Sequence, residues 1–364
     1  MAQAMQSSCQ CGRTNALRHI QWWRGLKNRV AIFLIDRYTY YNMTTFEQIT
    51  RPYAGDVPGC AIMIIRDDSP LLIKTQGCAD IENIVPVTPD TNFRLASVSK
   101  HFTASAILAL HKKGLLSLDA NLGEFFPQCT ENTKRVTIAQ LLMHTSGLTD
   151  YEELLDKEYV GQIHDHEVVE LLMQQDHGYF EPGCMFRYSN GGYCVLAIII
   201  ELVSGKSFAE FVRSELFAPL GMQNTFVNEE GVTAIPNRAY GYSRRGNAWL
   251  RTDQNATSAT IGDGGVYSSL NDLALWSRAL DTNSLFERRV LTNEQPSPSY
   301  YGFGLFEKEY GGTKVRYHAG GSIGFRIGFY TIPERKLTIL FLSNRNEGNG
   351  VEMCEKILST IASC

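Results

Sequence analysis

The chain has 364 residues, 44% of them hydrophobic and 20% charged, which is enough for a large buried core in one big domain or two interlocked ones. A formal net charge of −4, with no basic stripe interleaved with aromatic residues, excludes the usual polyanion binders, so no nucleic acid partner is expected. No apolar run is long enough to predict a membrane span.

Residues 1–42 have no clear hydrophobic period, and Met43 opens the first regular pattern. We interpret residues 1–42 as a poorly ordered extension or a start-site artefact, so deleting them should leave a folded, active protein. Within them, the apolar run Val30–Ile35 ends at Asp36 and is shorter than the apolar core of a signal peptide, which has about 7–15 residues. We therefore expect a cytoplasmic protein and favour a periplasmic or secreted one less.

Along the chain, the sequence next predicts a short amphipathic helix over 44–50. Two β-rich runs follow, Cys60–Ile65 and Leu71–Gln76, which are joined by a hairpin turn. An amphipathic helix follows from Ser97 and ends at Gly114, a C-terminal signal. The middle of the chain is helical in pattern, and strand patterns return before a last helix over 351–361. The other expected helices are 136–143, 167–175, 193–203, 208–216 and 271–280, and the late strands are 302–306, 314–317, 326–332 and 337–342.

Strands at both chain ends, joined by short turns, predict an α+β fold. Its largely antiparallel sheet is built from both ends of the chain, is flanked by helices and carries a mainly helical inserted region. We expect one domain over 43–364, with a sheet region of about 43–115 and 265–364 and a helical region of about 116–264. The cleft between the two regions is the expected active site.

Nine cysteines are scattered along the chain without a Cys-x-x-Cys pair that would indicate zinc or redox chemistry. We interpret most of them as small buried hydrophobes in a reducing compartment. The run His164-Asp165-His166 contains possible metal ligands, but a polar loop is the favoured interpretation. No metal or cofactor is therefore expected.

Ser97 and Lys100 are one helical turn apart and share a helix face, so the amine can reach the hydroxyl. A serine hydroxyl needs an adjacent base to become a nucleophile, and lysine serves in its neutral form. Backbone N–H groups at the start of the helix would favour developing negative charge. The pair alone is weak evidence, because a serine at a helix start is usually only an N-cap.

Two later motifs supply possible partners. Tyr188-Ser189-Asn190 precedes an apolar helix, where the phenol and the amide offer a proton relay and a substrate hydrogen bond. The same tripeptide is also a good turn and capping sequence. His318-Ala319-Gly320-Gly321 ends a strand pattern, and its glycines would let a substrate backbone approach closely. A lone histidine at a strand end is more often structural or solvated than catalytic.

Together these motifs resemble the serine β-lactamase and penicillin-binding-protein superfamily, in the branch of class C β-lactamases, D-alanyl-D-alanine carboxypeptidases and family VIII esterases. The resemblance covers about residue 45 to the C-terminus. The stretches that carry it, in family order, are FRLASVSK at 93–100, LLMHTSGL at 141–148, YSN at 188–190, GDGGVYS at 262–268, HAG at 318–320 and LSNR at 342–345.

The resemblance implies that Ser97 is the acylated nucleophile, Lys100 its base and Tyr188 the proton relay to the leaving group. A neutral Lys100 and a Tyr188 phenolate stay open as alternatives for the base. The substrate would be bound by Asn190 on its acyl side, and His318 and Gly320 would also belong to the binding site. The oxyanion hole would be the backbone N–H groups of Ser97 and Gly321, while the segment 144–147 is interpreted as structural, a helix ended at Gly147.

His318 departs from the Lys-Thr-Gly motif of class C β-lactamases, and a histidine there occurs in carboxypeptidase, D-aminopeptidase and esterase relatives. A partly charged histidine suits a substrate carboxylate less well than a lysine. We therefore expect esters to be turned over faster than the β-lactam nitrocefin. A rival nucleophile, Ser322, fits Gly-x-Ser-x-Gly, but a strand pattern follows it where that motif needs a helix, so Ser322 is interpreted as a loop residue.

The sequence thus predicts a serine hydrolase that works through a Ser97 acyl-enzyme on small esters or D-amino-acid amides and peptides. A β-lactamase, a D-alanyl-D-alanine carboxypeptidase and an acyltransferase are the enzymatic alternatives. A catalytically idle scaffold or binding protein of the same fold is the alternative outside enzymes. A small ester, amide or D-amino-acid peptide is the expected partner, and the oligomeric state is not predicted.

Overall fold

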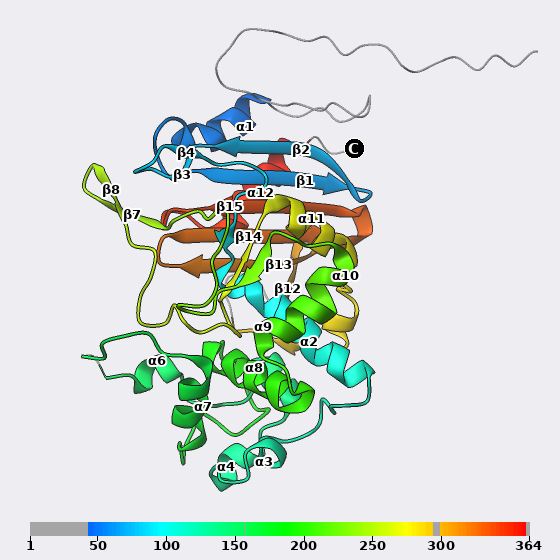
Figure 1. Ribbon diagram of the computed structural model, residues 1–364. Helices are drawn as coiled ribbons and strands as arrows, with labels where there is room; N and C mark the ends of the chain where they lie inside the picture. The colour runs from blue at the N-terminus through cyan, green and yellow to red at the C-terminus, as the bar shows by residue number, and fades with distance from the viewer. Residues whose placement is uncertain (1–42, 157, 294–298, 362–364) are drawn as a thin grey trace, which may run out of the picture. The chain divides into compact units, whose positions relative to one another are not determined.

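The structure, a computed structural model, describes residues 43–156, 158–293 and 299–361. The extension expected over residues 1–42 lies outside the described residues. The described chain is built on an eight-stranded sheet in the order β10-β11-β12-β13-β14-β15-β1-β2, and every neighbouring pair is antiparallel (Figure 1). The strands are β1 Cys60–Arg66, β2 Ser69–Gln76, β10 Val290–Leu291, β11 Tyr300–Tyr301, β12 Phe306–Tyr310, β13 Thr313–Ser322, β14 Phe325–Ile332 and β15 Leu337–Ser343.

Two hydrophobic cores lie on the two faces of this sheet, and the alternation of β1 divides its side chains between them. Cys60, Ile62 and Ile64 belong to the core under α1 (Met43–Thr50) and α12 (Gly350–Thr360). Ala61, Met63 and Ile65 belong to the larger core. That core also holds α2 (Lys100–Lys112) and α11 (Leu270–Ala279). The predicted α+β fold, with a largely antiparallel sheet built from both chain ends, is confirmed.

The helical region packs around α8 (Asn190–Ser204), most of whose apolar residues are buried and belong to the same larger core. Figure 1 shows α8 among the other helices of this region. Its helices are short because polar and glycine-containing loops separate them. Gly205 follows α8 with φ +69, which ends that helix in a left-handed residue. The other helices are α3 Leu122–Phe125, α4 Glu131–Lys134, α5 Ile138–Leu142, α6 Tyr151–Leu154, α7 Asp165–Met173, α9 Phe208–Val212 and α10 Ala218–Leu220.

The last helix of this region is α10, which ends at Leu220, and the chain after it forms the strands β6 to β9. These strands belong to small sheets, some of which also contain strands from before the helical region. The small sheets pair β3 with β4, β7 with β8, and β9 with both β5 and β6. Their bounds are β3 Cys78–Asp80, β4 Val85–Pro86, β5 Phe93–Arg94, β6 Thr225–Val227, β7 Tyr242–Arg245, β8 Ala248–Arg251 and β9 Val266–Ser268. The helix predicted over 208–216 stops at Val212 and continues as a π turn over Arg213–Phe217.

Three local predictions are wrong. The segment 302–306, expected as a strand, connects β11 to β12 instead. Its path is set by a close contact, since a Cβ at Gly302 would stand 2.3 Å from the carbonyl oxygen of Leu285. The segment His164-Asp165-His166 is no loop, since Asp165 begins α7 with His164 as its N-cap. Ser322 is the last residue of β13 rather than a loop residue.

None of the helices in the described residues has both the length and the apolar character that a bilayer crossing needs. The described cysteines are all free, and five of the six are buried, as predicted for small hydrophobes.

Candidate active site

Ser97 lies in a 3₁₀ turn, Ala96–Ser99, that leads directly into α2, whose first residue is Lys100. In a 3₁₀ turn the side chains at i and i+3 lie almost directly above one another, which brings the two functional groups together. The distance from Lys100 Nζ to Ser97 Oγ is 3.3 Å. The predicted pairing is therefore present, although the serine precedes the α-helix instead of starting it.

The Lys100 side chain is fully buried, and the hydrogen-bond partners of its side-chain nitrogen are neutral groups. Nζ donates to Asn190 Oδ1 at 2.9 Å and to the Asp263 carbonyl oxygen at 3.0 Å. No carboxylate of the described chain forms an ion pair with it. Two of the three hydrogen-bonding directions of Nζ are thus taken by carbonyl acceptors. The third points to the Ser97 hydroxyl, as it must if Lys100 is to accept the proton of Ser97.

Tyr188 and Asn190 are placed by the start of α8. Ser189 caps this helix by accepting a hydrogen bond from the Gly192 N–H, and its extended backbone places the side chains of its two neighbours on the same side, toward Lys100. Lys100 Nζ lies 5.0 Å from the centre of the Tyr188 ring. The buried Tyr188 hydroxyl has no hydrogen-bond partner among the described residues. The phenol is therefore beside the lysine and ready to exchange a proton with a bound group.

The ring of His144 packs against the ring of Tyr188. Its Nδ1 accepts a hydrogen bond from the Ser189 N–H at 3.1 Å, and its ring lies 4.3 Å from that of Tyr188. Burial, and then the charge of Lys100, hold the pKa of His144 well below its usual range. The helix predicted to end at Gly147 ends at Leu142 instead, and the left-handed residue after it is His144 with φ +58.

The edge of β13 faces the 3₁₀ turn. β13 joins β14 through the pair Ser322 and Phe325 and joins β12 through Tyr310 and Thr313, each across a two-residue turn. Residues that flank such a turn exchange both backbone hydrogen bonds, and the bonding direction then alternates along the strand. Odd-numbered residues of β13, Gly321 included, therefore direct their N–H groups away from β14.

Within the described chain β12 pairs only as far as Tyr317, so at Gly321 this edge packs against the turn that carries Ser97. The backbone N–H of Gly321 and that of Ser97, which lies in the first turn of a helical segment, thus face the same space. Gly320 permits the approach, since a Cβ there would stand 2.1 Å from the Leu95 carbonyl oxygen. The side of Gly320 on which a Cβ would stand is thus filled by the protein's own backbone, and its expected place in the substrate-binding site stays a prediction.

His318 is only 2% exposed, and both of its ring nitrogens are engaged. Nδ1 donates to the Ala319 carbonyl oxygen at 2.7 Å, which leaves Nε2 to accept from the Tyr301 hydroxyl at 3.3 Å. Burial, followed by the charge of Lys100, lowers the pKa of His318 to about 3. The side chain is therefore neutral, and its predicted contact with substrate would be through the ring face and not through a charge.

Ser97 lies between two cavities. The one on the Tyr188 side, here called the tyrosine-side cavity, has a volume of about 460 Å³. The one on the Asn190 side, the asparagine-side cavity, has a volume of about 310 Å³. The first is lined by Ser97, Tyr188, Phe306, Lys308, Tyr317 and His318, among others, and the second by Ser97, Glu152, Asn190, Asp263, Gly321 and Ser322, among others.

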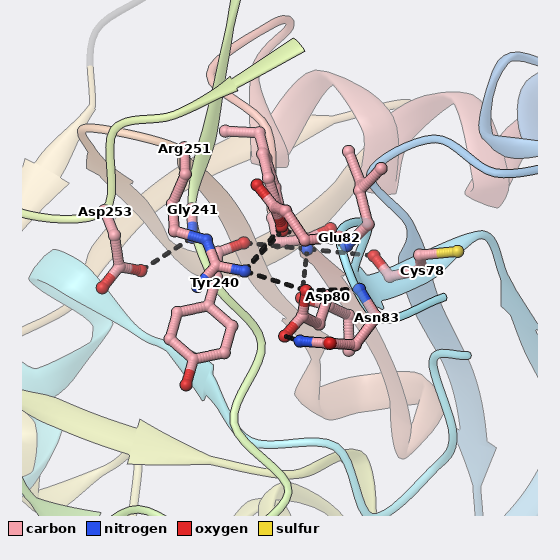
Figure 2. A network of polar contacts seen from close by, with 12 residues as sticks. Cys78, Asp80, Glu82, Asn83, Tyr240, Gly241, Arg251 and Asp253 are labelled. Carbon is pink, nitrogen blue, oxygen red and sulfur yellow. Dashed lines mark hydrogen bonds and ion pairs between the residues drawn. The ribbon is translucent and has the colours of Figure 1, made fainter. Parts of the chain in front are cut away.

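The segment 252–265, part of which lines the asparagine-side cavity, follows β8, and Figure 2 shows the polar contacts around Arg251 at the end of that strand. Arg251 forms ion pairs with Asp80 Oδ1 at 2.8 Å and with Glu82 Oε2 at 2.6 Å. Asp253, two residues further, accepts a hydrogen bond from the Gly241 N–H at 2.7 Å. These contacts tie the beginning of the segment 252–265 to β3 and to the chain before β7.

The far end of the segment 252–265 is held by Asp165. Its carboxylate accepts the N–H groups of Ile261 at 2.7 Å and Gly262 at 2.9 Å. Burial, and then the nearby Asp263 carboxylate, raise the pKa of Asp165 to about 7. Because Asp263 supplies a carbonyl acceptor to Lys100, Asp165 fixes one of the groups that orient the base.

Sequence reasoning missed Glu152 and Asp263, the two carboxylates of the asparagine-side cavity. Glu152 accepts a hydrogen bond from Asn190 Nδ2 at 3.1 Å, and partial burial raises its pKa. Glu152 lies in the short helix α6, and its sequence neighbourhood gave no signal. Among the described residues, no three histidine, cysteine or carboxylate side chains are arranged to hold a metal ion.

The rival serine, Ser322, has no helix after it. It ends β13, and β14 begins at Phe325. The strand that was expected after Ser322 is therefore present, and the strand–turn–helix geometry of a nucleophile elbow is absent.

Comparison with known proteins agrees with this geometry. The profile of the family described as Beta-lactamase matches residues 46–358. The D-aminopeptidase of Gluconobacter oxydans is 29% identical over 299 residues, which cover 79% of this chain and 56% of that protein. The D-aminopeptidase of Brucella anthropi is 29% identical over 326 residues, which cover 85% of this chain and 60% of that protein. The chain therefore spans little more than half the length of these two curated relatives.

Among solved structures, the octameric penicillin-binding protein homologue from Pyrococcus abyssi is similar in fold. It matches with a TM-score of 0.75 and 26% sequence identity, over 87% of this chain and 75% of that one.

Proposed function

We propose that this chain, which belongs to the Beta-lactamase family, is a serine hydrolase that cleaves small amides or esters through a Ser97 acyl-enzyme. The observation that carries the proposal is the 3.3 Å approach of Lys100 Nζ to Ser97 Oγ, with the other contacts of Nζ made to neutral carbonyl acceptors. No carboxylate of the described chain pairs with Nζ, and its remaining neighbour is the Ser97 hydroxyl, whose proton it would take in the reaction.

In the proposed reaction, Lys100 takes the proton of Ser97 while Oγ attacks the scissile carbonyl carbon. The backbone N–H groups of Ser97 and Gly321 bind the developing oxyanion. Tyr188 hands a proton to the leaving group as the carbon–nitrogen or carbon–oxygen bond breaks. Water then attacks the Ser97 ester by the reverse proton path and releases the acid.

The acyl group that this site favours carries a free amine, as in a D-amino-acid amide. Asn190 lies on the acyl side, and beside it Glu152 presents a carboxylate for which the described residues supply no salt-bridge partner. An unpaired carboxylate attracts a cationic amino group. Two relatives are D-aminopeptidases, which supports this substrate class and its D configuration.

The nucleophile is tested by labelling the full-length protein with a fluorophosphonate and locating the label by mass spectrometry. We expect the label on Ser97, its loss in Ser97→Ala and its retention in Ser322→Ala. A labelled Ser322 would overturn the assignment. An unlabelled wild-type protein that also fails to hydrolyse p-nitrophenyl acetate would favour an idle scaffold.

The acyl preference is tested with D-alanine p-nitroanilide and its N-acetyl derivative, which lacks the cationic amine. We expect the free amine to be preferred, and Glu152→Gln to reduce the preference about tenfold, which corresponds to about 1.4 kcal/mol. The matched control is Glu153→Gln, because Glu153 pairs with Arg187 and does not line the cavity. An equal preference in wild type and Glu152→Gln would contradict this part of the proposal.

A further inference from the structure

The tyrosine-side cavity has an aromatic wall made of Tyr188, Phe306 and Tyr317. The ring centres of Tyr188 and Phe306 are 6.4 Å apart with an angle of 11° between the planes. Those of Phe306 and Tyr317 are 5.4 Å apart at 17°. The three rings therefore form a nearly parallel row that starts at the proton relay, Tyr188, and belongs to the lining of the cavity.

The charges that line this cavity are unfavourable for an anion. Lys308 is the cation of its described lining, and its Nζ lies 2.8 Å from Glu355 Oε1 and 4.8 Å from the centre of the Tyr317 ring. A second carboxylate, Glu352, also lines the cavity and is exposed to solvent. With Lys308 paired, the remaining charge of the described lining is negative.

Two other groups that often bind anions are occupied. The cavity lies at the start of α12, but the Asn349 side chain accepts the N–H groups of Val351 at 2.9 Å and Glu352 at 3.3 Å. The capped helix end therefore has fewer free donors for a ligand. His318 uses both ring nitrogens within the protein. A carboxylate in this cavity would thus find no ready counter-charge in its described lining.

We propose that the tyrosine-side cavity is a leaving-group site for aromatic or bulky apolar groups without a carboxylate, so that the enzyme prefers N-substituted amides and esters to peptides that end one residue after the scissile bond. This inference rests on the proposed function, because Tyr188 gives its proton to the group that occupies the cavity. The bond from Ser97 Oγ to the acyl carbon forms, the bond to the leaving nitrogen or oxygen breaks, and that atom takes the proton from Tyr188.

The test compares D-alanyl-phenethylamide with D-alanyl-D-phenylalanine, whose leaving groups differ by one carboxylate and share the aromatic ring. The released amines are separated and quantified to give kcat/KM for each substrate. We expect the amide to be favoured at least about tenfold, and Glu352→Lys to reduce this ratio about tenfold by supplying an unpaired cation.

The matched control is Glu309→Lys, which makes the same charge change on β12 at an exposed residue that does not line the cavity. We expect it to leave the ratio of the two kcat/KM values unchanged. Equal turnover of the two substrates by the wild type, or an equal effect of both lysine variants, would overturn the inference.

A binding measurement separates this inference from the proposed function. Phenethylamine and D-phenylalanine are titrated into Ser97→Ala protein, which cannot form an acyl-enzyme, and binding is followed by NMR line broadening. We expect phenethylamine to bind at least about tenfold more tightly than D-phenylalanine. The reverse order would overturn the leaving-group site even if Ser97 is labelled. An unlabelled Ser97 in the wild type would overturn the proposed chemistry while the order of binding to the cavity stays as expected.

Discussion

Gly320 lies directly against the backbone of Leu95, and a Cβ at position 320 would stand 2.1 Å from the Leu95 carbonyl oxygen. This contact brings the edge of β13 onto the turn that carries Ser97. The relative position of the two backbone N–H groups in the proposed oxyanion hole thus depends on the lack of a Cβ methyl group at Gly320.

Gly320→Ala should therefore push β13 away from the 3₁₀ turn. We expect a loss of about 1–3 kcal/mol in the free energy of unfolding, as for overpacked cores, and at least a tenfold loss of kcat/KM. Gly321→Ala is the matched control for stability, since the nearest atom to its Cβ is Arg326 Nη1 at 3.9 Å and its N–H is kept. Urea unfolding and p-nitrophenyl ester turnover test both variants. Equal stability of the two would show that the approach to Leu95 is not tight.

Ala96, directly before the nucleophile, has a left-handed backbone with φ +47 and is buried. A β-branched side chain is a genuine outlier in this conformation, while glycine adopts it freely. We expect Ala96→Val to cost at least about 2 kcal/mol of stability, through strain and crowding, and to abolish Ser97 labelling. Ala96→Gly should stay within about 1 kcal/mol of wild type and should label normally.

The control for Ala96→Val is Ala109→Val in the last turn of α2, a half-buried position where the backbone is helical. The same substitution should cost only about 0.5 kcal/mol there. If both valine variants lose the same stability and label equally well, the left-handed turn is not what positions Ser97.

The strands were predicted well wherever the sequence alternates or is rich in β-branched residues. The runs at 60–65, 326–332 and 337–342 fall within one residue of β1, β14 and β15. The strand predicted over 302–306 was wrong, because contacts with residues remote in the sequence set the path of this segment. A Cβ at Gly304 would stand 2.9 Å from the carbonyl oxygen of Lys100, so this segment passes close to α2 and cannot carry the strand pattern that its aromatic residues suggest.

The catalytic candidates were found because their chemistry is local in the sequence. Ser97 and Lys100 are one turn apart, and Tyr188 and Asn190 flank one helix cap, so each pair is visible as a motif. Glu152 could not be found in this way. It reaches Asn190 across 38 positions of the chain, and nothing near it distinguishes this glutamate from its neighbour Glu153. Non-local packing decides which of the two faces Ser97.

Asp165 should make stability depend on pH in an unusual direction. Its pKa is raised to about 7, so the native state binds a proton that the unfolded chain, with a pKa of about 3.9, has already lost. The stability contribution is therefore fully present below about pH 4 and declines as pH rises to about 7. Asp165→Asn is neutral throughout and should lack this decline.

Urea unfolding of wild type and Asp165→Asn at pH 5, 6, 7 and 8 tests this prediction. We expect the stability of the wild type, relative to the variant, to fall as pH rises through this range. The exposed Asp176→Asn should show no such relative change. Parallel pH profiles for wild type and Asp165→Asn would contradict the raised pKa.

His101 should lower stability in acid. It follows Lys100, is fully buried, and neither ring nitrogen has a hydrogen-bond partner among the described residues. Burial, and then His318, hold its pKa well below the usual value. The native state thus stays neutral where the unfolded chain, with a pKa of about 6.5, takes up a proton, so stability is lost as pH falls below about 6.5.

His101→Leu removes both the unpaired nitrogens and this proton linkage while keeping most of the volume. We expect it to raise the free energy of unfolding by about 1 kcal/mol at pH 7.5, since an unsatisfied buried polar group costs about 1–3 kcal/mol and the ring's edge-on contact with Phe329 is lost. The gain should grow at pH 5.5. The control is His111→Leu, because His111 is exposed and bonds the Leu116 carbonyl oxygen through Nδ1. A gain that stays constant between the two pH values would mean that the ring is as easily protonated in the native state as in the unfolded chain.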